Sequence, residues 1–303
     1  MMMKKILLSL LCGTVMAATA FSQTTDWKKR YESLVARVGA DGVGVETTLN
    51  NWEKDDSLNT DMLKAKSDYY YLKSKTSEIV AKSEKKYLGR NPVMELKDSA
   101  GAPVYYFQET VFDEELLAKS FKYIDKVISL NPEKIDIRAE KITTLVEYEK
   151  DSPDMAFSEL MKVIDDDNAG IKWTYGGAEL LRDDFHQIIQ EYCYLFYSIG
   201  TPTALNAFKT VSEKMLSKYP QMSDYMDNIA AYYVATKDLK KGLKMYDKAL
   251  KIKPDDMTAI KSCVNIALLE KDKKLMKKYL PMMAKYGNET EKLQAQIRLD
   301  SLK

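Results

Sequence analysis

The side chains that could carry out chemistry are few in this sequence, and none of them completes a recognisable site. The chain has one histidine, His186, with no second histidine or nearby cysteine to complete a metal site or an acid–base pair. We therefore expect His186 on a helix surface or in a groove. The motifs G-x-S-x-G, H-E-x-x-H, C-x-x-C, G-x-G-x-x-G and the P-loop do not occur.

The acidic run at 165–170, DDDNAG, is similar to the start of a calcium-binding loop. Ala169 replaces the oxygen donor at the fifth place, and Gly176 stands where the closing glutamate belongs. We expect a solvated, helix-capping turn instead, and a non-enzymatic protein with no catalytic residues, cofactor or metal. An enzyme would need the segment 165–184 to close a pocket that gathers Asp183, Asp184, His186 and Tyr175.

The composition is that of a soluble, helix-rich protein. Of 303 residues, 45% are hydrophobic and 30% are charged, and 46 basic residues balance 45 acidic ones. This balance gives no electrostatic reason to expect nucleic-acid binding. Charge is nevertheless uneven, because 133–192 has 15 acidic and 7 basic residues while 237–285 has 6 and 14. These blocks are either solvated faces or a basic end that steers an acidic partner.

The first 22 residues have the pattern of a signal peptide. Lys4 and Lys5 precede a short apolar run, and the small residues Ala20 and Ser22 permit cleavage before Gln23 or after Ala20. Cys12 suggests lipid attachment, but Leu11 stands where a lipobox has a small residue, so an ordinary signal-peptide cysteine is favoured. We expect an exported protein, periplasmic or extracellular, with one domain over 23–303 and no membrane insertion after cleavage.

A period of 34 residues separates Pro220 from Pro254, and each proline follows a long amphipathic helix. The segment between them, 221–254, carries a pattern of small residues, aromatic residues and a final proline: Ala230, Tyr233, Gly242, Tyr246, Ala249 and Pro254. This pattern resembles the tetratricopeptide repeat (TPR) family. The resemblance implies a right-handed α-solenoid of antiparallel helix pairs.

Physical reasons support the pattern. The small side chains of Ala230, Gly242 and Ala249 let two helices approach closely, and we expect Tyr233 and Tyr246 to fill the space between these contacts. Pro254 cannot continue a helix, so it turns the chain into the next repeat, where Asp255 or Asp256 can cap the following helix. Stacked neighbours then bury the apolar faces that one pair leaves exposed.

The remaining helices fit the period only loosely, and two segments interrupt it. We expect helices over 26–88, with weaker pairs before and after the best repeat. Residues 90–112 alternate apolar and polar residues around a Ser-Ala-Gly-Ala-Pro turn, which predicts a β-hairpin near 92–112 in an otherwise all-α fold. The second insertion is 165–184. Either insertion could contribute to binding or only cover an exposed edge.

The repeat resemblance implies a scaffold that binds a peptide or protein on its concave face. The first helix of each pair would line that face, with six candidate positions: Gln190, Tyr194, Asp227, Ala231, Lys261 and Asn265. Lys261 and Asn265 have the spacing of a carboxylate-binding clamp, but the preceding repeat lacks matching residues. The alternative is a structural subunit of a cell-envelope assembly that docks through its convex face and insertions. The partner and the oligomeric state are left open.

The two cysteines of the predicted mature chain, Cys193 and Cys263, lie in apolar helical patterns. A disulfide requires a Cα separation of about 5.5 Å, which positions two repeats apart do not provide. We therefore expect two free, buried thiols.

Overall fold

The computed structural model describes residues 26–302, so the predicted signal segment, its two cleavage sites and Cys12 lie outside the described residues. The described residues are mostly helical, with one small three-stranded sheet and one very short hairpin among them. The helices before the sheet are α1 (Trp27–Val38), α2 (Val45–Asp55) and α3 (Thr60–Ser74). Those after it are α4 (Glu114–Leu130), α5 (Ile135–Glu149), α6 (Asp154–Ala169), α7 (Arg182–Ile199), α8 (Pro202–Lys218), α9 (Ser223–Ala235), α10 (Leu239–Ile252), α11 (Met257–Leu269), α12 (Lys273–Tyr286) and α13 (Glu289–Asp300).

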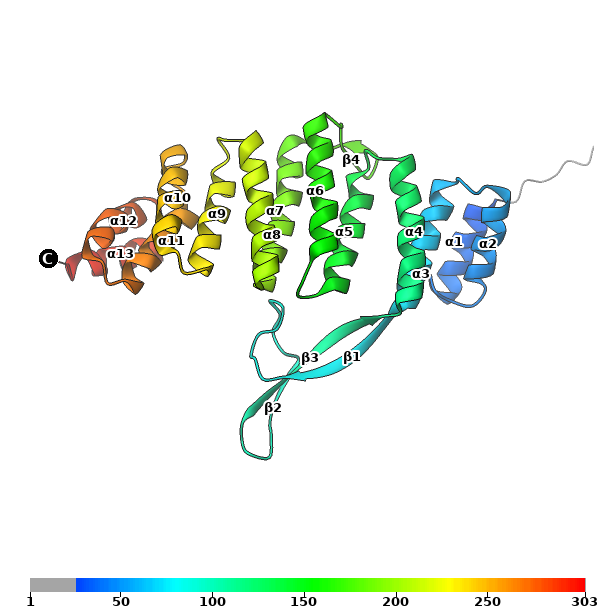
Figure 1. The fold of residues 1–303 in the computed structure, drawn as a ribbon, viewed down its shortest axis with the longest axis horizontal. Helices are drawn as coiled ribbons and strands as arrows, with labels where there is room; N and C mark the ends of the chain where they lie inside the picture. Colours follow the sequence, from blue (N-terminus) through cyan, green and yellow to red (C-terminus); the bar gives the residue numbers. More distant parts are fainter. Residues whose placement is uncertain (1–25, 303) are drawn as a thin grey trace, which may run out of the picture.

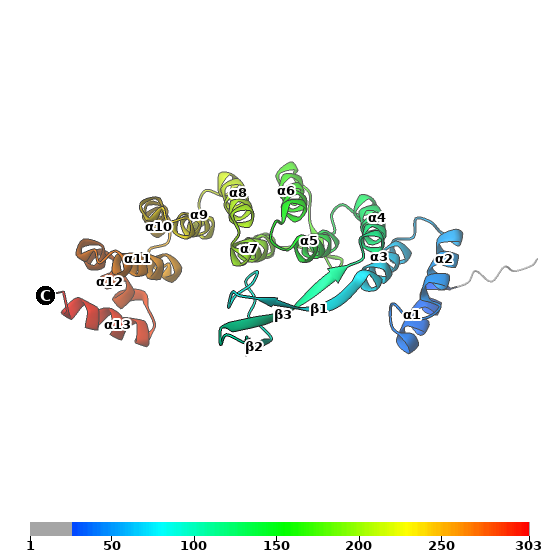
Figure 2. The same cartoon turned by 60° about the horizontal axis from the view of Figure 1, so that its bottom comes forward.

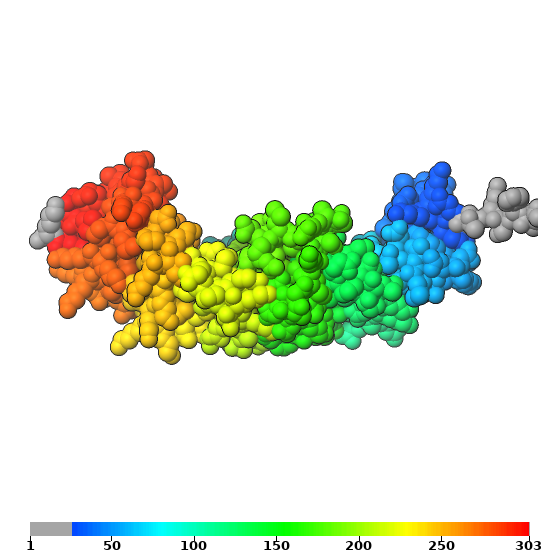
Figure 3. Space-filling view, turned by 90° about the horizontal axis from the view of Figure 1, so that it is seen from above, coloured from blue at the N-terminus to red at the C-terminus, as the bar shows by residue number. Residues whose placement is uncertain are grey.

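The helices follow one another along a curved row, and each packs against a neighbour, with α6 contacting α5 and α8 (Figures 1 and 2). In the second view α5 and α7 lie on the inner side of the curve, while α6 and α8 lie on the outer side. The space-filling view shows the colours passing in order from one end to the other (Figure 3). The buried apolar residues accordingly form three clusters in series rather than one central core. Among residues 26–302, no helix is long and apolar enough to cross a membrane.

The segment 221–254 forms the close helix pair α9–α10. Ala230, Tyr246 and Ala249 are buried, and a Cβ atom added to Gly242 would lie 2.9 Å from Val234 Cγ2. Helix α10 ends two residues before Pro254, and the Asp256 side chain caps α11 by accepting from the amides of Thr258 and Ala259. Tyr233 differs from expectation. Its ring is only half-buried and packs edge-on against Tyr232.

The sheet confirms the predicted hairpin and adds a strand that we did not predict. Strands β2 (Met94–Lys97) and β3 (Pro103–Phe112) pair antiparallel around the expected turn. Strand β1 (Lys75–Lys82) pairs antiparallel with the other edge of β3, which gives the order β1-β3-β2. The prediction of helix as far as residue 88 is therefore wrong from residue 75 onward. The β-branched residues Thr76, Ile79 and Val80 favour a strand, and β3 supplies the partner that makes it stable.

The acidic segment at 165–170 is not the solvated turn that we expected. Helix α6 continues through it to Ala169, and the loop that follows holds the short hairpin of β4 (Thr174–Tyr175) and β5 (Ala178–Glu179). The buried Asp167 carboxylate accepts hydrogen bonds from Arg182, Lys218 and Tyr219. Burial opposes its ionisation, but these hydrogen bonds outweigh that effect and hold the pKa of Asp167 below its usual value.

His186 is a core residue and does not lie on the helix surface or in a groove as predicted. It is buried, and its Nδ1 lies 2.9 Å from the hydroxyl of Tyr225. Burial, together with the charge of Arg182, lowers the pKa of the imidazole.

The prediction of buried free thiols is confirmed, since Cys193 and Cys263 are both buried and unbridged.

Candidate functional site

The three-stranded sheet projects from the ends of α3 and α4 and returns toward the inner helices of the row (Figures 1 and 2). The loop after β1 reaches α7 at Gly89, where a Cβ atom would lie 2.8 Å from the carbonyl oxygen of Ser198. Gly89 has φ +74°, a left-handed conformation that glycine adopts without a steric penalty. No other residue type fits this contact without displacing the loop or α7.

Charged hydrogen bonds fasten the base of the sheet to α5. The Glu147 carboxylate accepts from the Thr110 hydroxyl at 2.7 Å, the Tyr71 hydroxyl at 2.9 Å and the Lys75 ammonium at 3.1 Å. Burial opposes the ionisation of Glu147, but these donors outweigh it and lower the pKa of the carboxyl. A second tie joins Lys150, at the end of α5, to Glu109 of β3 at 2.6 Å. The sheet is therefore held in place at two independent points.

A hollow of about 330 Å³ lies between the returning loop and the two inner helices α5 and α7. Its apolar lining comes from Leu88, Val146, Leu195 and Ile199. The polar lining comes from Arg90, Thr110, Thr143, Glu147, Lys150 and Ser198. Glu147 and Lys150 already have partners in the sheet, whereas the Arg90 guanidinium donates a hydrogen bond of 3.3 Å to the carbonyl oxygen of Gln108. The hollow combines an apolar floor with a cation at its rim.

Two further hollows continue from this one along α7. The second, of about 460 Å³, shares Leu195 with the first and is also lined by Gln187, Gln190, Glu191 and Tyr194. The third, of about 240 Å³, shares Gln190 and Tyr194 with the second and adds Tyr197, Phe208, Asn228 and Ala231. We call these three neighbouring hollows, each of which shares lining residues with the next, the inner groove. It runs from the sheet insertion across α7 to α9.

Three of the six predicted partner-binding residues lie together in the inner groove. Gln190, Tyr194 and Ala231 line the hollow between α7 and α9, and the Tyr194 side chain is 68% exposed. Asn228 donates to Gln190 Oε1 at 2.8 Å, which positions both amides at the groove. Gln190 Nε2 is buried without a hydrogen-bond partner among the described residues.

The other three predicted residues do not line the groove. Asp227 is buried and faces the start of α11, so it is not available on the surface. Lys261 pairs with Glu291 of α13 at 3.2 Å, so its ammonium is already engaged, and Asn265 is exposed on α11 away from the groove lining. Periodicity identified which side of a helix faces inward, but it could not show that α13 approaches α11 here.

Sequence reasoning missed the part of the groove that the insertion creates. Leu88, Arg90 and Lys150 come together only because β1 is a strand and its loop returns to α7. One signal was present: Leu88-Gly89 follows the charged run at 84–86, which comes soon after the β-branched residues at 76–80. The residues of the suggested enzyme pocket are not gathered, since His186 is buried whereas Tyr175, Asp183 and Asp184 are exposed.

No model of a known protein family matches the chain, and no curated protein matches it either.

Proposed function

We propose that this chain is an exported, non-enzymatic scaffold whose inner groove binds an extended peptide segment of a partner protein. The observation that carries the proposal is the series of three hollows with shared lining residues from the sheet insertion to α9. We also propose that the curved row of helices is a right-handed, TPR-like solenoid. The close pair α9–α10, with Gly242 at its contact, supports this interpretation.

The shape of the groove favours an extended ligand. The hollow beneath the insertion is at the small end of the range of about 300–1,000 Å³ for small-molecule sites, so it suits one or two side chains. The groove then continues along α7, where the exposed rings of Tyr194 and Tyr197 offer contact area. Tyrosine suits such a surface because it provides a large contact area and loses little conformational entropy on binding. A peptide can occupy the whole length, whereas a compact molecule would fill only one hollow.

The polar groups of the groove suit a peptide main chain and an acidic group. The amides of Gln190 and Asn228 can bond to peptide N–H and C=O groups. The Arg90 guanidinium at the rim of the first hollow can pair with a carboxylate. We therefore expect an apolar side chain beneath the insertion, and an acidic residue or a C-terminal carboxylate next to it.

A peptide library displayed on phage provides the test, followed by titration calorimetry of the selected peptides. We expect selected peptides to share an apolar residue next to an acidic one and to bind at a single site. Replacing Tyr194 by alanine should weaken binding about tenfold, the effect of losing about 1.4 kcal/mol. The matched control is Tyr175→Ala, which removes a similarly exposed tyrosine from the β4 strand, outside the groove. Equal affinities for the two variants would contradict the proposed site.

One observation favours the alternative, a subunit of a cell-envelope assembly. The pairing register places Ile79, Met94 and Leu96 on one face of the sheet, and all three are exposed. An exposed apolar face of this kind is typical of a docking surface. Lysine at Ile79 and at Met94 would abolish co-purification with an assembly but would leave peptide binding in the groove unchanged. This double variant separates the two functions.

A further inference from the structure

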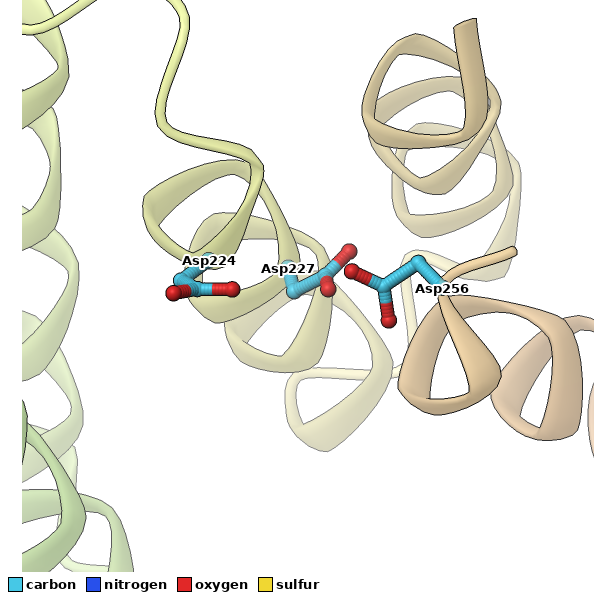
Figure 4. A group of neighbouring side chains, drawn as sticks. All are labelled: Asp224, Asp227 and Asp256. Atoms are coloured by element: carbon cyan, nitrogen blue, oxygen red, sulfur yellow. The ribbon is translucent and has the colours of Figure 1, made fainter. Parts of the chain in front are cut away.

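Three aspartates meet where α9 lies beside the start of α11 (Figure 4). Asp224 and Asp227 are three residues apart and so share one face of the first turns of α9. Asp256 is the N-cap residue of α11 and approaches them from the opposite side. Each aspartate offers one oxygen, and these three oxygens lie within 4.8 Å of one another.

Two of the three aspartates are buried, and the charge of the cluster is poorly compensated. Asp227 is 6% exposed and Asp256 is 4% exposed. Oδ1 of Asp227 has no hydrogen-bond partner among the described residues, although an unpaired buried oxygen of this kind is costly. Burial and the nearby carboxylates of Asp256 and Asp224 raise the pKa of Asp227 to about 8.

The surrounding groups fix Asp256 more firmly than Asp227, which interacts with Asp256 through a side-chain hydrogen bond and feels the charge of Lys253 only as a minor effect. Oδ1 of Asp256 accepts from the amides of Thr258 at 3.0 Å and Ala259 at 3.3 Å, which fixes the orientation of this carboxylate. Its Oδ2 lies 3.4 Å from the Ser223 hydroxyl and 3.7 Å from the Lys253 ammonium. Lys253 is the one cation paired with a member of the cluster in the described part of the chain, so three carboxylates share a single ammonium.

We propose that Asp224, Asp227 and Asp256 bind one divalent cation, with Ca²⁺ as the best match. All three donors are carboxylate oxygens, which hard cations prefer, and the cluster offers no nitrogen or sulfur for Zn²⁺ or Cu²⁺. With Ca²⁺–O distances of about 2.3–2.6 Å, any two oxygens that bind one ion lie no more than about 5 Å apart, and the three aspartate oxygens satisfy this limit. The smaller Mg²⁺ requires shorter distances of about 2.1 Å and a stricter octahedral geometry. Water molecules would complete the coordination on the side of the exposed Asp224.

The bound ion would join the start of α9 to the start of α11, which follows the turn that contains Pro254. Without the ion, the buried carboxylate of Asp227 either repels its neighbours or stays protonated. With the ion, Asp227 becomes a ligand and the two helices are fixed together. The site would therefore act as a cation-dependent clasp between neighbouring helix pairs.

Calorimetric titration of the EDTA-treated chain with CaCl₂, together with thermal unfolding with and without Ca²⁺, tests the proposal. We expect one site per chain, tighter binding of Ca²⁺ than of Mg²⁺, and a higher Tm with Ca²⁺. Asp227→Asn should weaken Ca²⁺ binding at least tenfold and remove the rise in Tm. In the absence of cation the same variant should be at least as stable as the parent chain, because it removes a buried charge without changing the side-chain shape.

The control variant is Asp183→Asn, which neutralises an exposed aspartate in the first turn of α7. It should retain the Ca²⁺ affinity and the rise in Tm of the parent chain. A second variant, Asp224→Asn, alters the exposed member and keeps the cap of α11, so it tests the site without the risk that loss of Asp256 poses to folding. The absence of saturable binding of Ca²⁺, Mg²⁺ or Mn²⁺ at millimolar concentration would overturn the proposal. Binding that is unaffected by Asp227→Asn would also overturn it.

Discussion

Two close contacts in this molecule depend on glycine, and they have different consequences. Gly242 lies inside helix α10, where an added Cβ would meet Val234 and the carbonyl oxygen of Ala230 on the neighbouring helix. Gly89 lies in a loop with φ +74°, where an added Cβ would meet Ser198 of a helix more than a hundred positions away in the sequence. The first contact joins two helices of the core. The second positions a loop over a hollow.

Because of this difference, we expect one contact to contribute mainly to stability and the other mainly to the candidate site. The contact at Gly242 is local, and it belongs to a pattern of small and aromatic residues whose other members are mostly buried. Gly89 itself is exposed, but its contact with Ser198 places the neighbouring Leu88 and Arg90 in the lining of the first hollow of the inner groove. We therefore expect substitutions in the α9–α10 pair to change mainly the free energy of unfolding. Substitutions in the insertion should change mainly peptide binding.

The largest effect should follow the loss of the buried ring in α10. Tyr246→Ala removes a side chain that is almost fully buried between α9 and α11, so it should leave a cavity and lower the free energy of unfolding by about 3–5 kcal/mol. Urea denaturation followed by circular dichroism measures this loss. The matched control, Tyr233→Ala, alters a half-buried ring of the same repeat and should cost clearly less. Equal losses would show that the pair does not pack around Tyr246.

The next effect concerns Asp167, which joins α6 to the start of α7 and the end of α8. Asp167→Asn should lower the free energy of unfolding by about 2–3 kcal/mol, because it removes the buried carboxylate that accepts from Arg182 and Lys218. The loss should not be larger, because both cations can still reach water. The folded-state pKa of Asp167 is lowered, so its contribution is fully present above the unfolded pKa of about 3.9 and is lost as the pH falls through the folded-state pKa. The difference between the parent chain and the variant should thus be constant from pH 5 to 7 and should shrink below about pH 4. Denaturation across this range checks the sign, and a difference that grows in acid would contradict it.

A third effect tests the insertion directly. Gly89→Ala should weaken the binding of a groove peptide about tenfold, because the new methyl group pushes the loop away from Ser198 and opens the first hollow. The control is Gly101→Ala in the β2–β3 turn, which has φ +84° but no atom within 4 Å of an added Cβ. Both variants place alanine in a left-handed conformation, and only one introduces a clash. Calorimetry with a selected peptide should therefore separate them, and equal binding would contradict the role of the Gly89 contact.

These comparisons also show which parts of the molecule its sequence could predict. The helical class, the α9–α10 contact and the β2–β3 hairpin follow from local patterns, because each depends on residues close together in the chain. Strand β1 was missed because its Lys-rich segment becomes a strand through pairing with β3, about 30 residues further on.

The candidate site shows the same limit. Gln190 and Tyr194 were predictable from the inward face of one helix, whereas Arg90 was not, because a long-range loop contact brings it to the groove. Asp227 was assigned to the correct helix, but its burial beside Asp256 depends on how α9 and α11 approach each other. Patterns within one element predict its faces, but they do not predict which other element covers them.

The smallest effect should come from the cation at the groove rim. Arg90→Gln retains a long polar side chain and removes the charge, so a peptide with an acidic residue should bind about two- to fivefold more weakly, as expected for an exposed ion pair worth less than about 1 kcal/mol. Because salt screens exposed charges, the difference between the parent chain and the variant should diminish between 50 and 500 mM NaCl. The same peptide with its acidic residue replaced by the amide should bind both proteins equally. A loss that persists with the amide peptide or in high salt would mean that Arg90 supports the loop through its bond to Gln108 and does not recognise the ligand. The proposed peptide would then not need an acidic residue.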